Sequence, residues 1–86
     1  MEQIIIDVGN SIRRIRKSKN LTQQQLADII GCELSTINRV ELGKTNVRVG
    51  TIIAIATGLE ISLYELFKGT KMEYFFDDDA FKIVYK

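Results

Sequence analysis

The sequence contains no histidine, no proline and only one cysteine, Cys32. Without histidine, neither a Ser-His-Asp triad nor a Cys-His pair can be built, and the usual zinc-ligand sets cannot be assembled. One cysteine excludes an internal disulfide, which fits a reducing cytoplasm. No apolar run is long enough to cross a membrane, so we expect neither a transmembrane span nor a signal peptide. These absences predict a cytoplasmic protein that is not an enzyme, holds no metal or cofactor and has no membrane partner.

Charge is distributed unevenly along a chain whose 86 residues suffice for one domain with a modest core. The net charge is only +1, but residues 10–48 carry eight Lys or Arg against three Asp or Glu. Residues 49–86 carry four Lys against six acidic residues. A basic segment in a nearly neutral chain is expected where one face meets a polyanion, and a solvated basic helix face is the alternative.

Apolar residues recur at helical spacing as far as residue 67, which predicts five helices at about 5–18, 22–30, 34–42, 49–58 and 62–67. Two capping boxes, TQQQ at 22–25 and SLYE at 62–65, mark the starts of the second and fifth helices. Gly31 can adopt the left-handed conformation that closes the second helix. The residues that mark the fourth helix are Val49, Ile52, Ile53 and Ala56.

After Gly69 the apolar period changes from helical to alternating, which predicts a β-hairpin around an acidic turn at 77–80. If the strands pair across that turn, six large apolar side chains share one face: Met72, Tyr74, Phe76, Phe81, Ile83 and Tyr85. A lone hairpin is marginal in water, so the helices or another chain must cover this face. The aspartates could bind a metal, but a solvated turn that protects the strand edges is favoured. We therefore divide the chain into a helical domain, 1–69, and an extension, 70–86, for dimerisation or partner contact.

Residues 22–42 have the small, turn-forming and apolar residues expected of two short helices joined at a steep angle. Ala27 lies where a larger side chain would hold the two helices apart, and Gly31 follows where the chain must turn sharply. Ile37 and Val40 are placed to pack the later helix back onto the earlier one. This pattern is typical of a helix-turn-helix unit, whose second helix lies in the major groove of DNA.

The chain resembles the Cro-like phage-repressor family, also called the xenobiotic-response-element family, over about residues 5–67. The stretch VGNSIRRIRKSKNLTQQQLADIIGCELSTINRVELGKTN follows the family pattern, and TIIAIATGLEISLYELF matches its two closing helices. The resemblance implies a mainly α fold, a five-helix lambda-repressor-like domain, to which the predicted hairpin is added. It also implies a regulator of transcription, most often a repressor, that binds double-stranded DNA as a homodimer on a palindrome.

The resemblance assigns roles to individual residues. The residues expected to reach base edges are Leu34, Ser35, Asn38 and Arg39. Those expected to contact DNA phosphates are Gln23, Thr36, Lys44, Thr45 and Asn46, with Arg48 as a further candidate. Arg39 can donate twice to guanine, and Asn38 can bond adenine. Arg16 and Glu41 are expected to form a mostly structural ion pair that orients the recognition helix. For Gln23, the resemblance implies a glutamine that bonds a phosphate and braces the recognition helix, and an ordinary helix-start glutamine is the alternative.

Six positions leave their roles open. Glu33 stands where the family usually has Ser or Thr; glutamate is a poorer N-cap, although its charge suits the helix dipole. Its carboxylate would repel a nearby phosphate, and it either accepts from a cytosine amino group or weakens binding. Leu34 stands at the first reading position, where it can touch only a thymine methyl group. Cys32 replaces the usual valine of the turn, and a small apolar role is favoured over redox sensing. Arg13, Arg14 and Lys17 supply either long-range electrostatics or a solvated surface.

Small phage repressors and the controller proteins of restriction systems both have this size. A second function is the antitoxin of a toxin–antitoxin pair, which also binds its own operator and would use the hairpin to face a toxin partner. Enzymatic activity is disfavoured, because acid–base chemistry would rest on scattered Asp, Glu and Lys with no predicted cleft.

Overall fold

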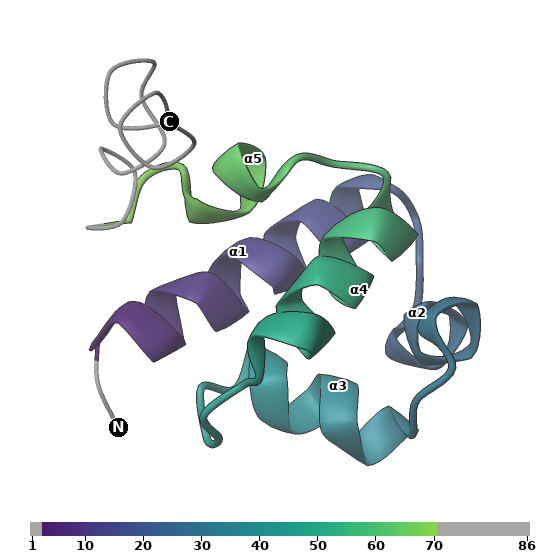
Figure 1. The fold of residues 1–86 in the computed structure, drawn as a ribbon. Coiled ribbons are helices and arrows are strands. Elements are labelled where there is room, and N and C mark those ends of the chain that lie inside the picture. Colours follow the sequence, from purple (N-terminus) through teal and green to yellow (C-terminus); the bar gives the residue numbers. More distant parts are fainter. Residues whose placement is uncertain (1–2, 71–86) are drawn as a thin grey trace.

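The computed structural model describes residues 3–70, and these residues form five helices (Figure 1). The helices are α1 (Gln3–Ser18), α2 (Gln23–Ile30), α3 (Leu34–Glu41), α4 (Val49–Leu59) and α5 (Leu63–Phe67). The described part of the chain contains no strand. The predicted five-helix, mainly α architecture is thus confirmed. The hairpin predicted at 72–86 lies outside the described residues and stays a prediction.

The core is assembled from all five helices around α1, which contacts α3, α4 and α5 (Figure 1). Helix α2 packs against α3 and α4. The largest fully buried side chains are Ile12, Leu26, Ile37, Ile55, Leu59 and Leu66. Each helix therefore contributes at least one of these side chains. None of the described helices is long and apolar enough to cross a bilayer.

Helix α4 is apolar on more than one side. Of the residues that mark it in the sequence, Ile52 and Ala56 enter the core. Val49 and Ile53 instead remain 74% and 48% exposed, and Ile55 and Leu59 complete the buried face. Because most of this helix is apolar, the spacing of its residues locates the helix but does not single out the buried face.

Local hydrogen bonds define the helix ends near the corner between α2 and α3. The predicted capping box is present: Gln25 N donates to Thr22 Oγ1 at 3.0 Å, and Thr22 N donates to Gln25 Oε1 at 2.8 Å. Gly31 closes α2 with φ 76° and ψ 37°, and its N–H donates to Ala27 O. That left-handed conformation is strained for residues with a Cβ, so glycine permits the short turn into α3.

Helix α1 approaches α3 backbone to backbone at Gly9. A Cβ at this position would collide with Val40 O and would lie 2.8 Å from Glu41 O. Gly9 is buried within α1, where glycine costs helix stability relative to alanine. The close approach therefore explains why glycine occupies this position. It also lets the end of α3 pack directly against α1.

Replacing Gly9 with alanine should destabilise the protein by about 1–3 kcal/mol, because the added methyl group meets backbone that cannot rotate away. Denaturant unfolding measures this change. Gly50→Ala in α4 is the matched control, since a Cβ there meets nothing within 4 Å. That control should be neutral or stabilising by up to about 1 kcal/mol. Equal unfolding midpoints for the two variants would contradict the close packing of α1 on α3.

Candidate nucleic-acid interface

Helices α2 and α3 form a rigid corner. Ala27 and Ile37 are fully buried between the helices, and Val40 is nearly so. The chain turns through Gly31, and Cys32 N donates to Ala27 O at 3.0 Å. Packing on one side of α3 leaves the other side of an eight-residue helix free to meet a partner.

The four predicted base-reading residues lie on the exposed side of α3. Leu34, Ser35, Asn38 and Arg39 are all exposed, whereas Ile37 and Val40 face the core. Thr36, assigned to a phosphate, is half-buried. A helix with one buried side and one side that carries Leu34 beside polar and cationic groups has the form needed to enter a major groove.

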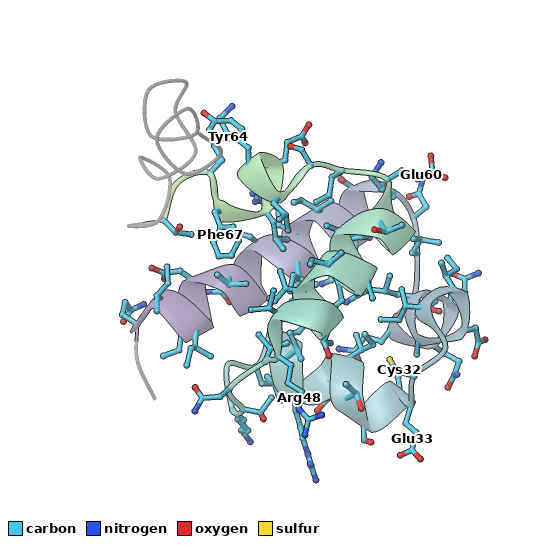
Figure 2. The ribbon with its side chains drawn as sticks, viewed as in Figure 1. Cys32, Glu33, Arg48, Glu60, Tyr64 and Phe67 are labelled. Carbon is cyan, nitrogen blue, oxygen red and sulfur yellow. The ribbon has the colours of Figure 1, made fainter. Side chains whose placement is uncertain are left out.

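The entrance to α3 carries an acidic group. Glu33 occupies the N-cap position and makes no capping hydrogen bond; its carboxylate instead accepts from Ser35 Oγ at 3.5 Å. Figure 2 shows Glu33 and Arg48 both projecting from the α3 side of the molecule, away from α5. The residues assigned to phosphates after α3 follow in the connection to α4, where Lys44 and Asn46 are exposed and Thr45 is half-buried. Charged or polar groups thus flank both ends of α3.

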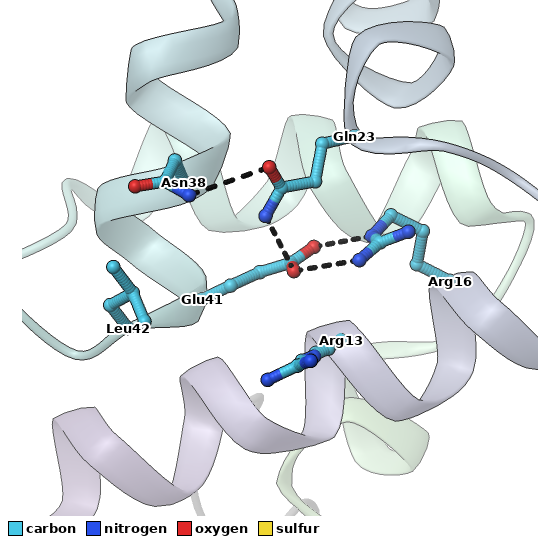
Figure 3. Close-up of a pocket in the computed structure, with 6 residues that line it drawn as sticks. All are labelled: Arg13, Arg16, Gln23, Asn38, Glu41 and Leu42. Atoms are coloured by element: carbon cyan, nitrogen blue, oxygen red, sulfur yellow. Dashed lines mark hydrogen bonds and ion pairs between the residues drawn. The ribbon is translucent and has the colours of Figure 1, made fainter.

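A buried ion pair joins α1 to the end of α3 (Figure 3). Arg16 Nε lies 2.6 Å from Glu41 Oε2, and Arg16 Nη2 lies 3.0 Å from Glu41 Oε1. Arg16 is 7% exposed and Glu41 is 4% exposed, so the pair is largely removed from water. The hydrogen bond to Glu41 raises the pKa of the Arg16 guanidinium, against the effect of burial. The predicted pair is therefore present, and its two parallel bonds fix the orientation of both side chains.

The ion pair continues toward the exposed face of α3. Gln23 Nε2 donates to Glu41 Oε1 at 3.0 Å, and Asn38 Nδ2 donates to Gln23 Oε1 at 3.4 Å. The resemblance predicts Gln23 and Asn38 as DNA contacts, a brace on the recognition helix from Gln23, and a structural pair of Arg16 and Glu41, but not these two specific bonds. The spacing of Asn38 and Glu41 puts them on neighbouring turns of α3, but nothing in the spacing shows that the first residue of α2 lies between them. The four residues form a continuous network from α1 to a candidate reading residue.

A groove of about 340 Å³ lies over this network. Its lining residues are Arg13, Arg16, Gln23, Asn38, Glu41 and Leu42 (Figure 3). Arg13 is exposed on α1, so the groove has a cationic rim next to the reading face. Of the three basic residues whose roles were open, Arg13 thus lines this groove. Among residues 3–70, no three His, Cys, Asp or Glu side chains are grouped to hold a metal ion.

Cys32 lies half-buried in the turn between α2 and α3 and packs against the core. Its Sγ lies 3.6 Å from Glu33 O. Burial raises the pKa of the Cys32 thiol, and the nearby Glu33 carboxylate raises this pKa further. A raised pKa keeps the thiol protonated near neutral pH, and the protonated form is a poor nucleophile. These features favour the small apolar role over redox sensing.

Comparison with known proteins gives a family match and several relatives. The model of a family described as helix-turn-helix matches residues 12–66. An uncharacterized HTH-type transcriptional regulator, YqaE of Bacillus subtilis (strain 168), is 36% identical over 88% of this chain and 66% of its own length. The control protein C.MunI of a Mycoplasma species is 35% identical over 85% of this chain and 100% of its own length.

Solved structures of controller proteins share the fold. The restriction-modification controller protein C.AhdI from Aeromonas hydrophila is 36% identical, with a TM-score of 0.71 over 73% of this chain and 96% of that chain. The controller protein C.Esp1396I, solved as a tetramer in complex with its natural 35-base-pair operator, is 25% identical. Its TM-score is 0.69 over 79% of this chain and 100% of that chain.

The rate of Cys32 alkylation should confirm the raised thiol pKa. Because burial and Glu33 both favour the protonated thiol, the pH–rate profile with iodoacetamide should rise at higher pH than that of the same chain unfolded in urea. Glu33→Gln should move the folded profile partway toward the unfolded one. A folded profile that rises at lower pH than the unfolded one would instead restore the redox alternative.

Proposed function

Because the chain belongs to the helix-turn-helix family, as its resemblance to the Cro-like repressors predicts, we propose that it is a sequence-specific regulator of transcription. It binds double-stranded DNA by placing α3 in the major groove. The observation that carries this proposal is the exposed face of Leu34, Ser35, Asn38 and Arg39 on a helix whose opposite face is fully buried. Such a helix presents its polar groups without conformational rearrangement.

The groups around α3 divide into readers and anchors. Arg39 and Asn38 carry the donors and acceptors that distinguish base edges. Gln23 and the amides at the start of α2 bind one phosphate, while Lys44, Thr45 and Asn46 bind another beyond the end of α3. Arg13, on the rim of the groove, adds positive charge beside the first of these phosphates. Phosphate contacts set affinity and register, and the α3 side chains set sequence preference.

The regulator is proposed to be of the controller type, acting as a repressor on a symmetric operator. C.MunI and C.AhdI are control proteins that this chain covers over 100% and 96% of their lengths, which supports a protein of the same size and plan. C.Esp1396I binds its operator as a tetramer, which supports a multimeric state for this chain, with a homodimer as its unit. A cytoplasmic location follows from such a role. The antitoxin alternative, with its toxin partner, is supported only by the sequence.

Substitutions at Arg39 and Lys44 should separate reading from anchoring. Arg39→Ala should cost about 1–3 kcal/mol of binding on the selected site and relax the preference at one position. Lys44→Ala should weaken binding to all duplexes alike and reduce the salt slope by about 1. Fluorescence anisotropy with matched and scrambled duplexes at several salt concentrations measures both effects. Lys68→Ala, an exposed lysine after α5, is the control and should change neither quantity.

Selection from a random duplex library at low salt supplies the site for those measurements. A symmetric motif with half-sites about one helical turn apart is the expected product. A library that yields no enriched motif would defeat the proposal of sequence-specific binding.

The extension at 70–86 is proposed to help join the two subunits. Light scattering should give a dimeric mass for the full chain and a lower mass, at the same concentration, for a chain ending at Gly69. If both chains were monomeric, the proposed homodimer and this role of the extension would fall together. If both were dimeric, the subunit interface would lie within the helices.

A further inference from the structure

We propose that Gln23 is a positioning residue that fixes the orientation of the Asn38 side-chain amide, so that Asn38 selects a base with an amino group in the major groove. This inference rests on the proposed DNA binding and assigns a specificity to one of its reading residues. It follows from the direction of the hydrogen bonds between Glu41, Gln23 and Asn38 (Figure 3).

The direction of these hydrogen bonds is set by the Glu41 carboxylate, which can accept hydrogen bonds but cannot donate them. Both of its oxygens are bonded to the Arg16 guanidinium, and Oε1 also accepts from Gln23 Nε2 at 3.0 Å. If the Gln23 amide were reversed, its own oxygen would face a nearly buried carboxylate oxygen. Such a contact places two acceptor oxygens against each other and loses the Gln23 hydrogen bond, and this is costly where water is excluded. The NH₂ group of Gln23 must therefore face Glu41.

Asn38 is exposed, so the cost of a reversed amide arises when contact with DNA excludes water from its bond to Gln23. With its NH₂ group on Glu41, Gln23 turns Oε1 toward α3, where Asn38 Nδ2 lies 3.4 Å away. This bond is the longest of the network, but a reversed Asn38 amide would again oppose two oxygens. Asn38 therefore turns its NH₂ group to Gln23 and its Oδ1 outward, as Figure 3 shows. The acceptor oxygens of a buried glutamate thus set which atom an exposed asparagine presents to DNA.

An outward Oδ1 discriminates between bases. In the major groove adenine offers the N6 amino group and cytosine offers the N4 amino group, whereas guanine offers only acceptors and thymine an acceptor and a methyl group. A freely rotating asparagine could turn its NH₂ group to guanine; one held by Gln23 meets guanine with an acceptor. The second hydrogen on Asn38 Nδ2 remains available for adenine N7. Asn38 should therefore favour adenine, accept cytosine and reject guanine.

The test is selection from a random duplex library with the full chain and matched variants. Asn38→Ala identifies the position that Asn38 reads, as the position where base preference is lost. At that position the unmodified chain should favour adenine or cytosine over guanine by about fivefold or more, the lower end expected for a good base contact. Gln23→Met keeps the length of the side chain but removes its amide. It should reduce this discrimination to within about twofold, while preferences at the other positions stay.

Gln24→Met is the control, because Gln24 is the neighbouring glutamine and bonds Asp28 Oδ1 at 2.9 Å, outside the network. It should leave every base preference unchanged. A role of Gln23 limited to a phosphate would weaken binding to all sequences and leave the base preferences intact, and that result would overturn the inference. Guanine or thymine as the favoured base of the unmodified chain would overturn it as well.

If thermal unfolding shows that Gln23→Met is not folded, Asn38→Asp provides the second test. This change lies at an exposed position and presents only acceptors, so it gives up the bond to Gln23 Oε1 but keeps an oxygen toward the groove. It should retain the preference for an amino-bearing base, although with weaker overall binding because of the added negative charge. Loss of that preference would show that Asn38 reads its base through NH₂. If the unmodified chain enriched no motif at all, the proposed function itself would fail. If it enriched a motif and Gln23→Met left the base preferences unchanged, only the role of Gln23 would fail.

Discussion

The buried ion pair between Arg16 and Glu41 determines how the recognition helix is held on the rest of the molecule. It connects α1 to the last residue of α3, and Arg16 Nη1 also donates to Leu21 O at 2.7 Å, which ties down the segment before α2. Removing either partner would strand a charge in a site from which water is largely excluded, at a typical cost of about 3–5 kcal/mol. One side chain, Arg16, thus links α1, the end of α3 and the segment before α2. The close approach at Gly9 holds the same C-terminal end of α3 against α1, through steric fit and not through charge.

The reading face depends on this arrangement because α3 cannot stand alone. A helix of eight residues is not stable in water by itself, so Ile37, Val40 and the ion pair must supply its stability. The same buried glutamate that anchors α3 also directs the amides of Gln23 and Asn38. Stability and specificity therefore share a residue in this protein. A change at Glu41 would alter the position of the helix and the chemistry that it presents, whereas a change at Arg39 would alter only the chemistry.

The sequence predicts those features that depend on neighbours along the chain. Helix periodicity, the capping box at Thr22 and the turn at Gly31 are local, and they locate α2 and α3 to within a residue or so. The Arg16–Glu41 pair came from the family resemblance, because a partner 25 residues away has no local signature. The contact of Gly9 with α3 and the bonds of Gln23 to Glu41 and Asn38 depend on how three helices cross, so the spacing did not reveal them. The buried face of α4 was also ambiguous, since Val49 and Ile53 are as apolar as the residues that enter the core.

The central claim is that the face built by α2 and α3 meets DNA while the ion pair holds that face in place. NMR spectroscopy of the ¹⁵N-labelled chain, titrated with its selected duplex, tests this most directly, because backbone and side-chain amides are observed together. The account predicts the largest shifts at Gln23, Ser35, Asn38, Arg39 and Lys44, including the side-chain NH₂ groups of Gln23 and Asn38, with α5 nearly unchanged. Shifts concentrated on α4 and α5, with the α3 amides unmoved, would contradict it.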